Sequence, residues 1–596
     1  MARNSLGSFF QSFKPLKKYI ADHRRMFLTG LLCAFLTNTL GMVFPLVIKF
    51  SVDSIGAARG TRILLMSVAL LIGIKIVQGL FRFLMRHILI GISRKIEYKI
   101  RANLFEHLQS LPISFYHRSR IGDIMSRATN DLNQVRMLVG PAIMYSFQTV
   151  ITVVLALPIM AYINLKLTVF SFLPLALVSL SYKKIGRIIH DRSMQVQSCL
   201  SDITAKAQEN VAGIRVVKSF TRESQEIERF GKLNLEYLRL NMNLIKVSGL
   251  LYPFMSFLSG VTSLIILGYG GMLVSRGTIT LGDFTAFFFY VAMMYWPMIA
   301  IGFVLNVIQR GRASLGRLME LFDTKSDITD SPLPEFNAPG PRTVKGQVSI
   351  RALNFSYPGA DSIVLNDISL EVAAGETLAV IGPVGSGKST LLELISRLYD
   401  PPPGTVLIDG IDVRQWPLEL LRRSISMVPQ DSFLFSESIR ENILYGLDHP
   451  VEEEEIIKVV KIAGLEKDIR QFPRQLDTLL GERGINLSGG QKQRATLSRA
   501  LMVDSPILLL DDCFSNVDTH TEETILGALG DFIKNRTTFI VSHRISTIRF
   551  ADRIAVIEKG GIPQLGTHEQ LLEDKQGYYA SLYEKQLLRE KIERIS

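Results

Sequence analysis

Apolar positions are distributed unevenly along the 596 residues of this chain. Before about residue 310, long apolar stretches recur, each of the length that a helix needs to cross the hydrocarbon core of a bilayer. Beyond residue 345 the apolar runs are short and alternate with helical patterns, which is typical of an α/β domain with a parallel sheet. The long stretches predict six membrane spans, at residues 27–51, 63–86, 139–162, 165–182, 249–274 and 283–308.

The polar segments between these spans predict how the chain is threaded. Segments 87–138 and 183–248 are long, polar and helical in pattern. Basic residues such as Lys17, Lys18 and Arg187 flank the spans, and the positive-inside rule therefore places both segments and the N-terminus in the cytoplasm. Residues 12–22 predict a short amphipathic helix on the same membrane surface.

Composition and charge also favour a membrane protein. The chain is 47% hydrophobic with a formal charge of +12, and much of the basic excess lies beside the apolar spans. That position argues for a membrane protein and against nucleic acid as a partner. The three cysteines have no metal or disulfide spacing, and the basic start runs into the first span without a cleavage pattern.

Two features within the spans are candidates for contact with a ligand. Lys75 interrupts the second span, where an ionisable residue is costly and either binds substrate or lines a polar cavity. The sixth span is rich in aromatic residues and methionine, which suit an adaptable apolar binding wall or ordinary helix packing. These residues are Phe284, Phe287, Phe288, Phe289, Tyr290, Met293, Met294, Tyr295 and Trp296.

Residues 382–390 read Gly-Pro-Val-Gly-Ser-Gly-Lys-Ser-Thr, directly after an apolar strand pattern at 378–381 and before a helical one. In this context the GxxxxGK[ST] pattern predicts a phosphate-binding loop. Its glycines let backbone N–H groups point at phosphate oxygens, Lys388 should neutralise the β- and γ-phosphates, and Ser389 should bind Mg²⁺. The residues expected to bind ATP here are Gly382, Gly385, Ser386, Gly387, Lys388, Ser389 and Thr390.

Two acidic residues follow an apolar run at 507–510. The run predicts a buried strand that ends in Asp511, whose carboxylate would hold Mg²⁺. The next residue, Asp512, lies where a carboxylate could orient the attacking water.

With these motifs in this order, the chain resembles an ATP-binding cassette (ABC) exporter half-transporter over nearly its whole length. The resemblance implies a multidomain protein: an all-α six-helix transmembrane domain with long cytoplasmic helical loops, then an α/β P-loop nucleotide-binding domain. We expect the transmembrane domain at 1–323, a proline-rich linker at 324–345 and the ABC nucleotide-binding domain at 346–596. The implied location is the plasma or inner membrane, with a cytoplasmic nucleotide-binding domain.

The resemblance also assigns roles to single residues. Tyr357 would stack on adenine, Gln430 would sense the γ-phosphate and contact Mg²⁺, and His543 would contact the γ-phosphate. The expected catalytic groups are Asp512, His543 and Gln430, and the expected metal ligands are Ser389, Gln430 and Asp511. Segments near 112–127 and 209–224 resemble the regions that couple the two domains.

A second ATP-binding motif, Leu487–Gln491, resembles the family's signature sequence. In the family this sequence completes the ATP site of a second cassette, so the resemblance implies that the chain works in a pair. The residues that would bind the partner's nucleotide are Ser488, Gly489, Gly490 and Gln491.

Asp512 departs from the family pattern, because most relatives carry glutamate there. Its carboxylate is one methylene shorter and would stand back from the water by roughly 1–1.5 Å, and a displacement of that size costs about a hundredfold in rate. We therefore predict slow hydrolysis at this chain's own site and a heterodimer with a second half-transporter that carries the glutamate.

The predicted function is ATP-driven export of hydrophobic or amphipathic compounds, drugs or lipids. One alternative is a homodimeric lipid flippase, which brisk ATPase activity of the chain alone would favour. An alternative of another class is an ATP-gated regulatory or channel subunit, which would not accumulate substrate uphill.

Overall fold

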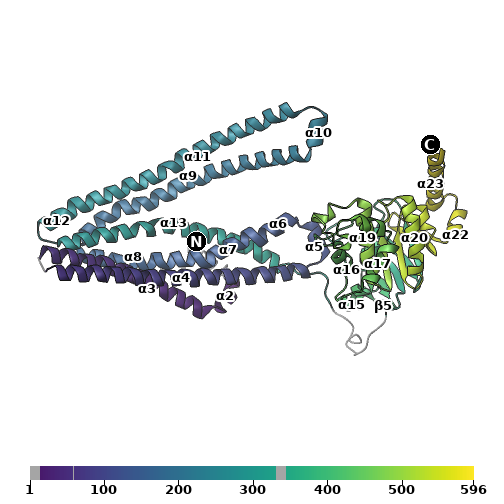
Figure 1. The fold of residues 1–596 in the computed structure, drawn as a ribbon, viewed down its shortest axis with the longest axis horizontal. Coiled ribbons are helices and arrows are strands. Elements are labelled where there is room, and N and C mark those ends of the chain that lie inside the picture. The colour runs from purple at the N-terminus through teal and green to yellow at the C-terminus, as the bar shows by residue number, and fades with distance from the viewer. Residues whose placement is uncertain (1–13, 58–59, 331–343, 361, 596) are drawn as a thin grey trace. The chain divides into compact units, whose positions relative to one another are not determined.

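The computed structural model describes residues 14–57, 60–330, 344–360 and 362–595 (Figure 1). The chain forms two compact units. The first contains the residues up to Gln109 together with Ile121–Thr324, and the second contains Ser110–Arg120 together with Lys325–Ser596. The short segment Ser110–Arg120, which the sequence assigned to the transmembrane domain, thus belongs to the second unit.

The first unit is helical throughout its described residues. Five of its helical stretches are long and apolar enough to cross a membrane: Arg24–Gly56, Thr61–Ser110, Ile121–Ile163, Glu223–Ser275 and Leu281–Asp323. They contain five of the six predicted spans. The fourth, 165–182, begins α9 with the apolar stretch Leu165–Pro174, and most of its remaining side chains lie outside the described residues.

Short π-helical turns interrupt the longer stretches of this unit. The helices are α2 (Lys14–Ala21), α3 (Arg24–Gly56), α4 (Thr61–Ser110), α6 (Ile121–Ser126), α7 (Leu132–Met137), α8 (Ile143–Ile163), α9 (Leu165–Ala212), α10 (Ile214–Ser219), α11 (Glu223–Ile265), α12 (Gly271–Ser275) and α13 (Leu281–Asp323). The predicted amphipathic helix is α2, with Leu16 buried. Its predicted apolar residue Phe13 lies outside the described residues.

The aromatic sixth span, in α13, divides into buried and exposed positions. Phe287, Tyr290 and Met294 are fully buried, and the Tyr290 hydroxyl donates a hydrogen bond to the Met42 carbonyl at 2.7 Å. On the exposed side of the helix lie Phe288, Phe289 and Trp296. Helix packing therefore accounts for the buried set, and the exposed set is available for contact with another molecule. Phe284, Met293 and Tyr295 are half-buried.

Lys75 on α4 has partners within the first unit. Its Nζ lies 3.9 Å from the centroid of the Phe44 ring and donates to Gln78 Oε1 at 3.4 Å. Gln78 in turn donates to the Thr37 carbonyl at 3.0 Å. Lys75 is exposed on the helix, and these contacts stabilise its ammonium there. A role in binding substrate stays a prediction.

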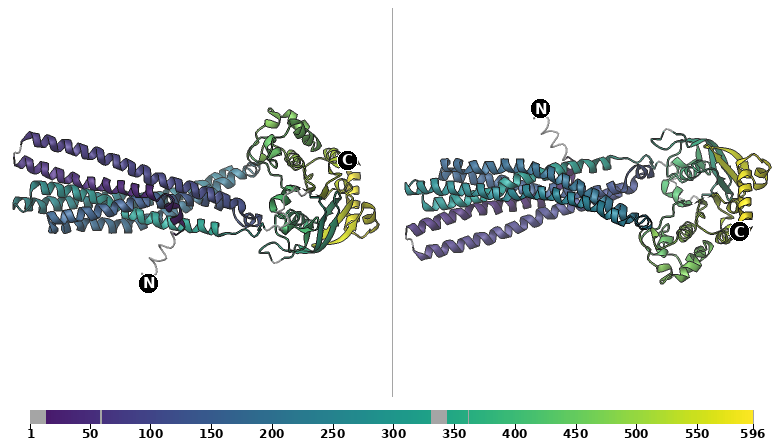
Figure 2. Two further views of the ribbon diagram at one scale, coloured as in Figure 1. Left: turned by 90° about the horizontal axis from the view of Figure 1, so that it is seen from below. Right: turned by 90° about the horizontal axis from the view of Figure 1, so that it is seen from above.

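Helices α9 and α11 run side by side and diverge from the other helices of the unit, joined at their far end by α10 (Figures 1 and 2). Their apolar residues Leu235, Leu238 and Met242 remain exposed along α11. At the tip, Val216 of α10 is 61% exposed, and Phe220, directly after the helix, is 71% exposed. An exposed apolar surface of this kind is typical of a site that contacts another protein or a membrane.

The second unit is built on a six-stranded sheet with the strand order β10-β9-β3-β8-β7-β6. Strands β9, β3, β8, β7 and β6 are parallel, and β10 is antiparallel to β9. The strands of this sheet are β3 (Thr377–Ile381), β6 (Ile425–Val428), β7 (Ile507–Asp511), β8 (Thr537–Val541), β9 (Arg553–Glu558) and β10 (Gly561–Gly566). Both β3 and β7 are fully buried, as expected for a parallel sheet covered on two faces.

A smaller antiparallel sheet has the order β2-β1-β4-β5, with β1 (Val348–Phe355), β2 (Leu365–Val372), β4 (Val406–Ile408) and β5 (Ile411–Asp412). The helices of the unit are α5 (Ile113–Arg118), α14 (Lys388–Ile395), α15 (Leu418–Arg423), α16 (Ile439–Leu444), α17 (Glu453–Ile462), α18 (Glu466–Gln471), α19 (Gly489–Met502), α20 (Thr519–Ile533), α21 (Ile545–Ile548), α22 (His568–Glu573) and α23 (Tyr578–Ile595).

The start of the predicted linker is attached to this unit. The Thr329 carbonyl accepts a hydrogen bond from the buried Arg397, and Asp330 accepts one from the Leu418 backbone N–H at 3.1 Å. The proline-rich stretch 331–343 lies outside the described residues.

Candidate nucleotide-binding site

The order β3-β8-β7 in the large sheet brings three distant motifs together. The phosphate loop follows β3, His543 follows β8, and Asp511 ends β7. Because parallel strands end at the same edge of a sheet, all three lie at one edge, where open α/β sheets bind ligands.

A cavity of about 350 Å³ lies at this edge. It contains almost all the residues predicted for this chain's own ATP site. The apolar part of the cavity wall is formed by three residues that the sequence analysis did not single out: Val364, Val384 and Val541. The predicted residues that line it are Tyr357, Gly385, Ser386, Gly387, Lys388, Ser389, Thr390, Gln430, Asp511, Asp512 and His543.

Two glycines of the phosphate loop are required by its backbone path. Gly387 has φ +102°, and a Cβ there would lie 2.5 Å from Leu365 Cδ2. Gly382 has φ +150°, and a Cβ there would lie 2.0 Å from the Ile557 carbonyl oxygen. Any other residue would clash at either position, so these glycines let the loop turn into α14, whose N-terminus faces the cavity.

The charged groups of the cavity are buried. Lys388 Nζ donates to the carbonyls of Gly382 and Pro383, at 3.0 and 2.8 Å, and burial lowers the pKa of its ammonium against the opposing effect of Asp511 and Asp512. Burial likewise raises the pKa of the Asp511 carboxyl, which is partly offset by a hydrogen bond from Ser389. Burial thus disfavours the charged form of both groups, and a bound phosphate and cation would favour it.

These residues fit a phosphate ligand and its Mg²⁺. The Ser386 hydroxyl is buried without a hydrogen-bond partner among the described residues, which is costly unless a ligand satisfies it. The Ser389 hydroxyl and the Asp511 carboxylate are in contact, and both offer the oxygen ligands that Mg²⁺ prefers.

Asp512 has a left-handed backbone, with φ +46°, and its N–H donates to the Val541 carbonyl at 3.0 Å. Aspartate is one of the few non-glycine residues that tolerate this conformation. The strand pair β7–β8 therefore fixes the backbone at Asp512, which lines the cavity together with His543.

Tyr357, the predicted adenine platform, is held by residues that the sequence analysis missed. Its hydroxyl is hydrogen-bonded to Thr390 Oγ1 at 2.8 Å and donates to Glu393 Oε2 at 2.9 Å, and its ring stands edge-on to Tyr399, 5.0 Å between centroids. Burial raises the pKa of the Glu393 carboxyl. The sequence signal for the contact between Tyr357 and Glu393 was weak: Glu393 lies one helical turn after Ser389.

The Tyr399 hydroxyl is also hydrogen-bonded to His117 Nδ1, at 2.7 Å. His117 lies on α5, inside the first predicted coupling region, and Ile113 of the same helix packs on the core of the second unit. Tyr357 is thus connected through Tyr399 to a coupling helix.

The signature residues are not part of the cavity. Ser488 and Gln491 form a reciprocal N-terminal cap on α19, and Ser488 and Gly489 are exposed. A Cβ on Gly490 would lie 2.7 Å from the Asn516 carbonyl oxygen, so the signature is closely packed on the loop after Asp512. The exposed N-terminus of α19 thus lies outside the cavity that contains this chain's own phosphate loop.

Substitution of Tyr357 should separate the contribution of its aromatic ring, which would stack on adenine, from that of its hydroxyl, which is hydrogen-bonded to Thr390 and Glu393. Tyr357→Leu removes the aromatic face and should weaken ATP binding about tenfold, because stacking of a base on an aromatic ring contributes on the order of 1–3 kcal/mol. Tyr357→Phe keeps the face and should stay within about threefold of wild type. Titration with a fluorescent ATP analogue measures both, and equal loss in the two variants would contradict stacking.

The fold and site define an ATPase-coupled membrane transporter. Residues 27–298 match the family model described as the ABC transporter transmembrane region, and residues 365–515 match the one described as ABC transporter. The chain belongs to the ABC transporter family. It is a multi-pass membrane protein with a cytoplasmic nucleotide-binding domain, and ABC exporters of this kind work as dimers.

Relatives include the probable multidrug resistance ABC transporter ATP-binding/permease protein YheI of Bacillus subtilis, 34% identical over 97% of this chain and 98% of the relative. The ATP-dependent lipid A-core flippase of Syntrophus aciditrophicus is 33% identical over 97% and 95%. Among solved structures, a bacterial Atm1-family ABC exporter with ATP bound matches with a TM-score of 0.75 and 28% identity, over 94% of this chain and 98% of the other.

Proposed function

We propose that this chain is the weak-site half of a heterodimeric exporter that moves hydrophobic or amphipathic compounds, drugs or lipids, across the membrane. The names of its relatives, a multidrug transporter and a lipid A-core flippase, support this range of compounds. The exposed Phe288, Phe289 and Trp296 of the sixth span are available to contact such compounds.

The observation that carries the proposal is the separation of the two halves of an ATP site within one chain. The cavity at the sheet edge has the phosphate loop, Asp512 and His543, but the signature Ser488–Gln491 lies elsewhere. A second cassette, placed head to tail, would supply a signature to this phosphate loop and a phosphate loop to this signature.

The two helices in the predicted coupling regions, α5 and α10, also favour a pair of chains. In α5, Ser114 is buried and His117 is hydrogen-bonded to Tyr399, both within this chain's own nucleotide-binding unit. In α10, Ile214 and Val216 are exposed, and so is Phe220 directly after it. A partner cassette would cover α10, so that each cassette is connected to both chains.

In this scheme Lys388 and the phosphate-loop N–H groups bind the phosphates, and His543 and Gln430 contact the γ-phosphate. Ser389, Gln430 and Asp511 would hold Mg²⁺, which supplies charge neutralisation between the phosphates. Asp512 orients the attacking water poorly because its carboxylate is short, so ATP binding at this site would close the pair and the partner's site would hydrolyse.

The test is the ATPase rate of the chain purified alone, beside the same chain co-produced with a second half-transporter that has glutamate after its Walker B aspartate. We expect brisk activity only in the mixture, together with uphill accumulation of a dye or lipid in inverted vesicles. Brisk activity of the chain alone would instead establish the homodimeric flippase. ATP-dependent closure without uphill accumulation would establish the regulatory or channel subunit.

A further inference from the structure

The segment after β8 places His543 in the nucleotide cavity and then starts α21 one residue after Arg544. The first N–H groups of any helix lack partners inside the helix, and the Arg544 side chain does not cap α21. A side chain from the distant helix α23 supplies the missing partner. Gln586 accepts a hydrogen bond from the Ile545 N–H at 2.8 Å and donates one to the His543 carbonyl at 2.5 Å.

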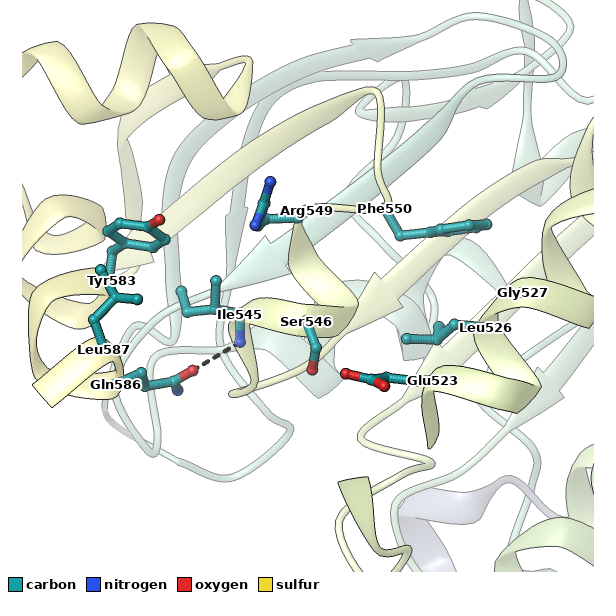
Figure 3. Close-up of a pocket in the computed structure, with 10 residues that line it drawn as sticks. All are labelled: Glu523, Leu526, Gly527, Ile545, Ser546, Arg549, Phe550, Tyr583, Gln586 and Leu587. Atoms are coloured by element: carbon teal, nitrogen blue, oxygen red, sulfur yellow. Dashed lines mark hydrogen bonds between the residues drawn. The ribbon is translucent and has the colours of Figure 1, made fainter. Parts of the chain in front are cut away.

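Figure 3 shows this contact, with Gln586 of α23 facing the start of α21. The amide group is planar and engages backbone atoms on both sides of Arg544. One side chain therefore fixes the orientation of the two peptide groups that follow His543.

Helix α23 is itself anchored in the core of the unit. Tyr579, in its first turn, is fully buried in a cluster that includes Ile381, the residue before the phosphate loop, and Ile545 of α21. Its hydroxyl is hydrogen-bonded to His568 Nδ1. Gln586 lies seven residues further on and therefore on the same face of the helix, so the anchored turn aims its amide at α21.

The other side of the His543 segment is held by the loop after Asp512. Arg544 donates to the Val517 carbonyl at 2.9 Å and forms an ion pair with the buried Glu522 of α20. Ser546 and Thr547 donate to the same carboxylate. His543 thus lies between a polar contact to α20 and one to α23.

These two contacts are separated by open space. A cavity of about 520 Å³ lies between α20, α21 and α23, and Leu526, Phe550 and Tyr583 are among its lining residues (Figure 3). Packing across this cavity is incomplete, and the apolar contact between α21 and α23 is made by Ile545, which is buried in the same cluster as Tyr579. Hydrogen bonding by Gln586 is therefore the constraint that α23 adds directly to the backbone of His543.

We propose that Gln586 is a positioning residue for ATP hydrolysis, acting through the backbone of His543. The inference rests on the proposed contact of His543 with the γ-phosphate. Without the amide, the His543 carbonyl and the Ile545 N–H lose their partner, and the imidazole is free to move away from the phosphate. Nucleotide binding at the phosphate loop, which Gln586 does not contact, is unaffected.

The experiment measures ATPase kinetics of the assembled transporter in lipid nanodiscs for Gln586→Ala and Gln586→Glu, after the partner's catalytic glutamate has been changed to glutamine so that only this chain's site is read. Each variant is made both in the wild-type chain and in the Asp512→Glu chain. Its ATPase rate is compared with that of the parent chain in the background in which this chain's site hydrolyses ATP. We expect both variants to lower kcat about tenfold with KM for ATP within about twofold. Glutamate keeps the acceptor for Ile545 but loses the donor to His543, so its defect assigns the effect to the His543 carbonyl.

Lys585→Ala, at the exposed neighbouring position of α23, is the matched control and should leave kcat unchanged. Hydrogen exchange of the peptide 542–548 should rise in Gln586→Ala, while exchange of the phosphate loop stays the same. An unchanged kcat in both Gln586 variants overturns the proposal, and so does a fall in kcat that accompanies weaker ATP binding and a lower Tm. An Asp512→Glu background that turns over no faster than wild type contradicts only the weak site, because the Gln586 ratio is taken within one background.

Discussion

Replacing Asp512 by glutamate is expected to raise ATP hydrolysis at this chain's own site by about a hundredfold. The extra methylene moves the carboxylate toward the water, and His543, Lys388 and Asp511 already line the same cavity. Because residue 512 has φ +46°, glutamate there should also lower the free energy of unfolding by about 1 kcal/mol. Phosphate release is measured in the heterodimer after the partner's catalytic glutamate has been changed to glutamine.

Asp512→Asn is the control for this substitution, because it keeps the length of the side chain and removes its charge. Its rate should remain at or below that of the wild-type site. If the wild-type site already hydrolyses ATP as fast as Asp512→Glu, aspartate suffices as the catalytic carboxylate and the weak-site proposal fails.

Replacing Gly490 by alanine is expected to lower total ATPase activity of the heterodimer about a hundredfold. A Cβ at this position would lie 2.7 Å from the Asn516 carbonyl oxygen, so either the signature or the loop after Asp512 has to move. In the proposed pair this signature completes the partner's competent site, and displacement by about 1 Å is enough to cause such a loss.

The control is Gly527→Ala on α20, where a new Cβ meets no atom within 4 Å, and we expect wild-type activity. Lys388→Ala affects this chain's own phosphate site. Its comparison with Gly490→Ala tests whether the two ATP sites of the pair differ in hydrolysis. In a heterodimer, Gly490→Ala should lower turnover much more than Lys388→Ala does. Equal losses would mean that both sites hydrolyse ATP, as in a homodimer.

The composition of the cavity at the sheet edge could be predicted from the sequence because its motifs are local. A phosphate loop is defined by glycines that permit its backbone path and by the lysine and serine that follow them, all within nine residues. Asp511 and His543 each directly end or follow a buried apolar strand, and parallel strands that are neighbours in a sheet bring their ends together. The apolar spans were equally predictable, since their length follows from the thickness of the bilayer.

Helix periodicity alone could not divide the sixth span into its packed and exposed residues. Phe287 and Phe288 are adjacent and chemically identical, yet one is fully buried and the other is exposed. Which of them can meet a transported compound depends on how α13 packs against α3 and α8, and neighbours of this kind are set by the tertiary structure.

By itself the sequence determined the class of the protein, the membrane spans and the residues of the nucleotide cavity, because each depends on a short pattern with a direct physical requirement. Only the tertiary structure decided what holds those residues in place. It connected Tyr357 through Tyr399 to His117, and it set Gln586 of α23 against the backbone of His543. These contacts join residues 42 to 282 positions apart, and no local pattern specifies which side chains will meet across such distances.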